Sequence, residues 1–178
     1  MTKAVLVTVA IAIATVGCGR AEEPASVPPD AVDASGPVLV SLADLRASVP
    51  HLDGWTRGNI VAESATAPDP STHAVVTFTS ASGALELEIA DTGGAERVFE
   101  SLEHMAGSEV NRVVDNGYFK GTTILGFPAV ESWNTVDKLG ELSVLIKRRY
   151  IIHVTGTGLA DAAPMRALAE AVDTSRLR

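Results

Sequence analysis

The sequence THAVVTFTSASGALELEIAD, residues 72–91, decides the fold that we predict for this chain. Its second half alternates apolar and acidic residues, in the order Leu85, Glu86, Leu87, Glu88 and Ile89. Successive side chains of a strand point to opposite faces of a sheet, so this period predicts a strand with one buried face and one face in water. Residues 80–83 contain the turn formers serine and glycine and separate this strand from a run rich in β-branched residues. The stretch therefore predicts an antiparallel hairpin.

Three segments outside the hairpin have the period of an amphipathic helix, and such helices can cover its apolar face. Residues 41–50 begin with Ser41, a residue typical of helix N-termini, and end at a proline. Residues 95–107 carry apolar side chains at helical spacing up to a glycine. The last helix is predicted to start near Asp161, with Pro164 in its first turn, where proline is tolerated.

Further strands are predicted on both sides of the middle helix, at residues 55–64, 118–124, 129–134, 141–147 and 150–155. Strands grouped in this way do not give the regular alternation of strand and helix that a parallel sheet needs. We therefore predict an α+β fold, an antiparallel sheet covered by two or three helices, formed by a single globular domain over residues 38–178.

Several local patterns accompany this order of elements: Gly54-Trp55, the sequence GFPAVES at residues 126–132, and GELSVLIKRRYIIHVTG at residues 140–156. Together they resemble the PsbP-like α/β/α sandwich group, which contains photosystem extrinsic subunits and many small bacterial lipoproteins. The resemblance implies a sandwich of that kind and a non-catalytic accessory role at a membrane.

The N-terminal segment has the layout of a secretory signal peptide. Lys3 precedes an uncharged apolar run at residues 4–16, and small residues follow it. As a helix this run would rise about 20 Å, which is short of the roughly 30 Å of hydrocarbon in a bilayer. Residues 14–18, ATVGC, resemble a bacterial lipobox. That resemblance implies cleavage between Gly17 and Cys18 and a diacylglyceryl thioether on the Cys18 sulfur, which would anchor the chain durably because two or more acyl chains are buried.

We therefore predict three parts: a signal peptide at residues 1–17, a lipidated N-terminus with a disordered tether at residues 18–37, and the domain at residues 38–178. The tether is rich in proline, alanine and acidic residues and has no hydrophobic period. The protein would be anchored on the outer side of the cytoplasmic membrane or in the outer membrane, facing the periplasm.

The composition limits the partners. The formal net charge is −8 at pH 7, and an acidic chain repels nucleic acid and anionic headgroups. We expect contact with the membrane through the lipid and contact with an envelope protein as partner. The chain has one cysteine, so once Cys18 is acylated no disulfide and no thiolate site remains.

No set of residues with catalytic or metal-binding spacing is found. The four histidines, His51, His73, His104 and His153, lie far apart in the sequence, so we predict no metal and no cofactor. The sequence TSASG at residues 79–83 lacks the first glycine of a nucleophile elbow. Glu86 and Glu88 share a strand face but are interpreted as solvated acids.

The remaining conspicuous side chains are also assigned structural places. Lys147, Arg148 and Arg149 form a basic cluster at a predicted turn, with Lys120 expected nearby, and such a cluster either is simply solvated or docks an acidic partner or lipid headgroups. The aromatic residues are predicted to lie in the core; they include Trp55, Tyr118, Phe119, Phe127 and Trp133.

Three functions stay open at this point. The first is a lipid-anchored envelope lipoprotein with a non-enzymatic accessory or binding domain. The second is an envelope hydrolase whose serine, histidine and aspartate come from separate loops, which predicts a serine within hydrogen-bonding reach of a histidine in a cleft. The third is a carrier of a small apolar ligand, which predicts a closed apolar cavity between the sheet and one helix.

Overall fold

A computed structural model describes residues 37–66, 69–94, 96–107 and 111–178. The chain separates into two units, residues 1–34 and 35–178, and all described residues belong to the second. The described elements run in this order: α1 (Leu42–Ser48), β1 (Thr56–Arg57), β2 (Val61–Ala65), β3 (Ser71–Ser80), β4 (Gly83–Asp91), α2 (Glu96–Gly107), β5 (Asn111–Val114), β6 (Gly117–Ile124), β7 (Phe127–Asn134), β8 (Leu139–Ile146), β9 (Tyr150–Thr157), α3 (Ala163–Glu170) and the 3₁₀ helix η1 (Thr174–Arg176).

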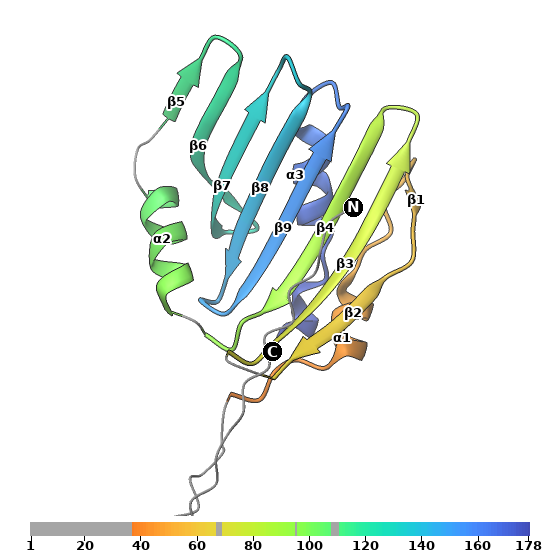
Figure 1. Cartoon of the computed structure of the whole chain (residues 1–178), viewed down its shortest axis with the longest axis vertical. Coiled ribbons are helices and arrows are strands. Elements are labelled where there is room, and N and C mark those ends of the chain that lie inside the picture. Colours follow the sequence, from red (N-terminus) through yellow and green to blue (C-terminus); the bar gives the residue numbers. More distant parts are fainter. Residues whose placement is uncertain (1–36, 67–68, 95, 108–110) are drawn as a thin grey trace, which may run out of the picture. The chain divides into compact units, whose positions relative to one another are not determined.

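The strands form one antiparallel sheet in the order β1-β3-β4-β9-β8-β7-β6-β5, with β2 also paired to β3 (Figure 1). The predicted hairpin of residues 72–91 is confirmed as β3 and β4, with Ser80 opposite Gly83 and Val76 opposite Leu87. The prediction of an antiparallel α+β fold with helices on the sheet is confirmed as well.

Two strand predictions need correction. The single strand expected at residues 55–64 is two short strands, β1 and β2, which pair with successive parts of β3. Gly58 still donates its N–H to the carbonyl of Thr77 at 2.8 Å, and the register against β3 shifts by one residue before Val61. The edge strand β5 was not predicted, because its pairing with β6 depends on a turn after Val114 rather than on an apolar period.

One face of the sheet carries the main hydrophobic core. Leu87 and Ile89 of β4 and Ile152 of β9 are fully buried on this face. The helices α1 and α3 pack against it, and α3 contributes Met165 and Leu168, which are also fully buried. The prediction that β4 has one buried apolar face is thus confirmed, because its apolar side chains face this core.

The helix α2 packs on the sheet face opposite α3 (Figure 1) and contacts β6, β7 and β8. Phe99 is its fully buried anchor. The close approach depends on Gly121 of β6, because a Cβ atom there would collide with the backbone oxygen of Ala106. The position of α2 leaves the neighbouring strands β9, β4 and β3 beside the helix rather than beneath it.

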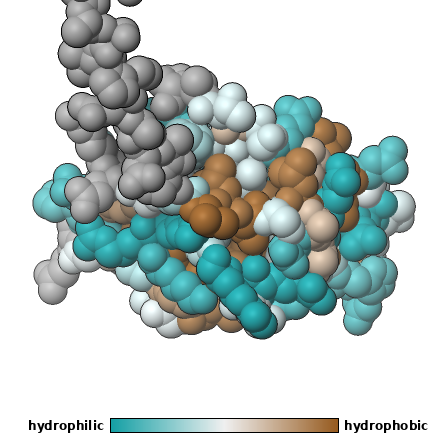
Figure 2. Space-filling view, turned by 90° about the horizontal axis from the view of Figure 1, so that it is seen from below, coloured by the Kyte–Doolittle hydropathy of each residue, from teal (hydrophilic) through white to brown (hydrophobic). Residues whose placement is uncertain are grey.

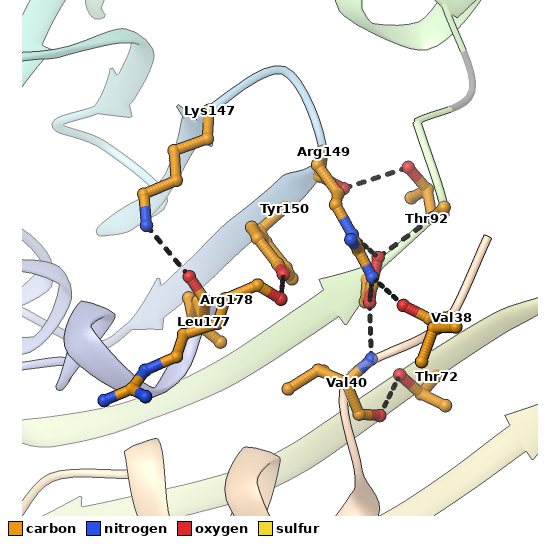
Figure 3. A network of polar contacts seen from close by, with 11 residues as sticks. Val38, Val40, Thr72, Thr92, Lys147, Arg149, Tyr150, Leu177 and Arg178 are labelled. Carbon is orange, nitrogen blue, oxygen red and sulfur yellow. Dashed lines mark hydrogen bonds and ion pairs between the residues drawn. The ribbon is translucent and has the colours of Figure 1, made fainter.

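A polar network joins the ends of the described chain to the sheet (Figure 3). The buried carboxylate of Asp91 accepts hydrogen bonds from the backbone N–H of Val40 at 2.7 Å and from Nε of Arg149 at 2.8 Å. Lys147 donates to the carbonyl of Leu177 at 3.0 Å. Burial by itself would raise the pKa of Asp91, but the bonds from Arg149, Val40 and a neighbouring backbone N–H outweigh it and lower that pKa.

The basic cluster at the β8–β9 turn is therefore bound within the domain. Besides the contacts of Lys147 and Arg149, Arg148 forms an ion pair of 3.2 Å with Glu103 of α2. Lys120 is not near this turn as expected: it lies on β6, two strands from β8 and in register with Leu142, and its Nζ is 3.6 Å from Glu131. The cluster stabilises a turn in which Lys147 and Arg148 have φ of 53° and 51°, the left-handed region that residues other than glycine rarely adopt.

Candidate binding cleft

A cleft of about 380 Å³ lies between α2 and the sheet. Its walls are the α2 side chains Ser101, Leu102 and Met105 and the sheet residues Glu88, Ala90, Ser143, Ile151 and His153. The cleft forms because α2 packs over β6, β7 and β8 but not over β9. The edge of the helix therefore rises beside the uncovered strand and forms one wall of the cleft. We call it the α2 cleft.

The α2 cleft lies toward the end of the sheet where β4 ends and β9 begins, since Ala90 and Ile151 are next to the ends of those strands. Figure 2 views the molecule from this end and shows apolar residues exposed among hydrophilic ones. Ala90 and Ile151 are cross-strand partners, and both are half-buried. They form an apolar floor, and Leu102 and Met105 form the wall.

A row of three polar side chains crosses the floor. Glu88 of β4 lies opposite His153 of β9, which lies opposite Ser143 of β8. All three point to the α2 side of the sheet and are half-buried. The hydroxyl of Ser143 lies 2.9 Å from Nδ1 of His153, within hydrogen-bonding distance, and the tautomer of the ring decides which of the two donates.

A second, smaller hollow of about 170 Å³ lies on the other side of the same helix contact. It shares Leu102, Met105 and Ser143 with the α2 cleft and adds Phe119 and Val130. Leu102 and Met105 thus separate two depressions beneath α2. Movement of their flexible side chains would join the two volumes.

The Ser143–His153 pair has part of the geometry of a nucleophile and its base. A serine hydrolase needs in addition an acid that orients the histidine and donors that receive the oxyanion. Within the described residues Glu88 forms no ion pair with His153, although it occupies the next strand. Ser143 lies in the interior of β8, which is paired on both sides, so the backbone N–H groups around it are used in the sheet.

The remaining histidines do not line the cleft, although His73 lies opposite Ala90 of its floor. His51 is exposed and lies 3.7 Å from Asp53, His73 is on β3, and His104 is on the exposed side of α2. Within the part of the chain that the structure describes, no group of three or more histidine, cysteine or acidic side chains could hold a metal ion.

The serines of residues 79–83 and the aromatic residues have structural places. Ser80 and Ser82 bond to each other at 2.8 Å in the β3–β4 turn. Trp133 is 6 % exposed in the core, as predicted, whereas Trp55 and Phe127 are half-buried at its margin. Cys18 and Gly17, the predicted lipid attachment and cleavage positions, lie outside the described residues.

The sequence did not single out the buried carboxylate of Glu131. It is 0 % exposed on β7 and accepts hydrogen bonds from the Arg166 guanidinium of α3, one of them at 2.5 Å, and from the Tyr118 hydroxyl. Burial would raise the pKa of Glu131, but the bonds from Arg166 and Tyr118 outweigh it and lower that pKa. Burial and the bond to Glu131 raise the pKa of Tyr118 to about 12. This group ties α3 to the sheet.

Comparison of the chain with protein-family models, with curated proteins and with solved structures finds no match. Across the described ranges, the helices are all too short or too polar to cross a bilayer. Any function must therefore be argued from the α2 cleft and from the N-terminal sequence.

Proposed function

We propose that the protein is a lipid-anchored lipoprotein of the bacterial cell envelope whose single domain acts by binding rather than by catalysis. The anchor is supported by the resemblance of residues 14–18 to a lipobox and by the apolar run before it. An antiparallel sheet with helices on both faces is compatible with a PsbP-like α/β/α sandwich. The tether at residues 18–37 would hold the domain facing the periplasm, where it would serve an envelope protein as an accessory.

Metabolic labelling tests the anchor. A radioactive fatty acid supplied to cells that express the full chain is expected to label the protein, and Cys18→Ser is expected to abolish the label. Ser80→Ala, a serine of the distant hairpin turn, is the matched control and is expected to keep it. A label that survives Cys18→Ser would contradict the lipoprotein.

The α2 cleft is the observation that carries the binding function. Small-molecule sites are concave, of roughly 300–1,000 Å³, mainly apolar, and contain a few polar groups that fix orientation. The α2 cleft has this composition: Ala90, Leu102, Met105 and Ile151 are apolar, and Glu88, His153 and Ser143 form one polar row. It is open at one side, in contrast to the closed cavity expected for a carrier, so a ligand can enter without unfolding α2.

Methionine methyl resonances can detect occupation of the cleft. Met105 lines the α2 cleft, and Met165 is fully buried in the core on the other face of the sheet. The full-length protein with ¹³C-methyl methionine, held in phosphatidylcholine nanodiscs, would be titrated with cyclohexylmethanol as a neutral apolar probe. We expect a saturable shift of Met105 and a constant Met165. Equal shifts of both, or of neither, would contradict binding at the cleft.

A second function, hydrolysis, is favoured by the 2.9 Å contact between Ser143 and His153. A fluorophosphonate probe distinguishes it, because such a reagent attaches covalently to an activated serine. The binding function predicts no labelling above that of Ser143→Ala. Labelling that Ser143→Ala and His153→Ala both abolish, and that Ser101→Ala on the opposite wall leaves intact, would establish the hydrolase instead.

A further inference from the structure

We infer that the ligand of the α2 cleft is a small organic cation, with an apolar body against α2 and a primary or secondary ammonium group beside Glu88. This inference rests on the proposed binding function and specifies its ligand class. It is carried by the arrangement of charge in the cleft and around it.

Among the described residues that line the cleft, Glu88 is the one with a fixed charge, and none is a lysine or an arginine. Within the described residues, neither a hydrogen bond nor an ion pair engages its carboxylate, although the residue is partly buried. Asp91 and Glu131, the two fully buried carboxylates, are in contrast bonded to arginines. A half-buried carboxylate without a partner favours a cation from solution.

The surroundings of the cleft have the same sign. Glu86 and Glu141 are exposed on the same sheet face, each two residues along its strand from Glu88 and Ser143, respectively. Among the described side chains, Arg148 of the β8–β9 turn is engaged by Glu103 of α2 at 3.2 Å. The described carboxylates would therefore repel an anionic ligand both on approach and at the wall.

The polar row also suits the hydrogen bonds of an ammonium group. Such a group offers two or three N–H donors and no acceptor. The carboxylate of Glu88 accepts such bonds, and the Ser143 hydroxyl has a lone pair left when it donates to His153. The apolar body would then lie along Ile151 and Ala90 toward Leu102 and Met105. One end of the ligand is thus fixed by charge and the other by apolar contact.

Three probes with the same carbon skeleton test the inference. Cyclohexylmethylammonium, cyclohexylmethanol and cyclohexanecarboxylate would be titrated against the full-length protein in phosphatidylcholine nanodiscs, with the Met105 and Met165 methyl resonances as the readout and empty nanodiscs as the control for partitioning. A charge-assisted bond to Glu88 predicts that the ammonium compound binds about tenfold more tightly than the alcohol. The carboxylate is expected to bind more weakly than the alcohol.

Two matched variants locate the charge. Glu88→Gln keeps the shape of the wall and is expected to bring the ammonium compound to within about threefold of the alcohol. Glu86→Gln removes an acid of the same strand and the same face that does not line the cleft, and it is expected to keep most of the preference.

The outcomes separate the inference from the proposed function. If all three probes shift Met105 with equal affinity, or if Glu88→Gln leaves the preference for the ammonium compound intact, the cation inference is overturned while the binding cleft stands. If cyclohexylmethanol and the ammonium compound both fail to shift Met105, the binding function is overturned together with the inference.

Discussion

The buried group around Glu131 gives the sharpest prediction for stability. Its carboxylate is 0 % exposed, whereas the side chain of Arg166 is 39 % exposed, so the two partners are not equivalent. Removing Arg166 leaves a charge inside the protein, but removing the charge of Glu131 leaves an arginine that can turn toward water. The two single substitutions should therefore differ in cost.

The magnitudes follow from this asymmetry. Breaking a buried pair by removing one partner costs about 3–5 kcal/mol of unfolding free energy. Lys120 remains 3.6 Å from Glu131, so we expect Arg166→Met to fall at the lower end, about 3 kcal/mol. In Glu131→Gln the amide oxygen still accepts from Tyr118, and we expect a loss of about 1–2 kcal/mol. The double variant should be more stable than Arg166→Met alone, because it no longer buries an unpaired charge.

Urea unfolding of the four proteins at pH 7, followed by tryptophan fluorescence, measures these differences. Trp133 is 6 % exposed and lies on β7, the same strand as Glu131, so it reports on this region. The reasoning is refuted if Arg166→Met costs no more than Glu131→Gln, or if the double variant loses the sum of the two single losses.

Two further predictions concern the pH dependence of stability and the packing of α2 on the sheet. Folding lowers the pKa values of Asp91 and Glu131 from their ordinary values of 3.8 and 4.5, so their contribution to stability is complete above about pH 4.5 and is lost as the pH falls through the folded values. The urea midpoint should therefore be constant from pH 7 to 5 and fall toward pH 3. A midpoint that rises with acidification would contradict this. In Gly121→Val the new side chain should collide with the backbone of Ala106 and push α2 away from β6, which should lower the unfolding free energy by about 1–3 kcal/mol and weaken probe binding. Gly107→Ala is the control, because a Cβ there meets nothing within 4 Å, and it should change neither quantity. Calorimetry and the Met105 titration measure the two effects, and equal behaviour of the two variants would contradict the prediction.

Local patterns in the sequence were sufficient for most elements of this fold, but not for β5 or for the division between β1 and β2. The alternation around Leu87 identified the central hairpin, because a period of two depends on neighbouring residues alone. The helix after Ser41 was also predictable, since the Ser41 hydroxyl accepts from the N–H of Asp44 within one turn. The break between β1 and β2 was missed, because it is a one-residue shift in their register against β3, which follows them in the sequence.

The candidate site was not predictable in the same way. Glu88, His153 and Ser143 come from three strands, and their row depends on the pairing of β4 with β9, which are separated in the sequence by α2 and four other strands. His153 was therefore interpreted as an isolated histidine and Glu88 as a solvated acid. The basic turn was misjudged for a related reason, since the acceptors of Lys147 and Arg149 lie far away in the sequence.

The central claim is that the hollow beside α2 binds a ligand, and filling that hollow tests it most directly. Ala90 lies on its floor and outside the main core, so Ala90→Leu should occupy the space without disturbing the fold. In the Met105 titration with cyclohexylmethanol, we predict that the wild-type chain shows a saturable shift and that Ala90→Leu shows none, while the unfolding free energies agree within about 0.5 kcal/mol. An unchanged affinity in Ala90→Leu would contradict the account.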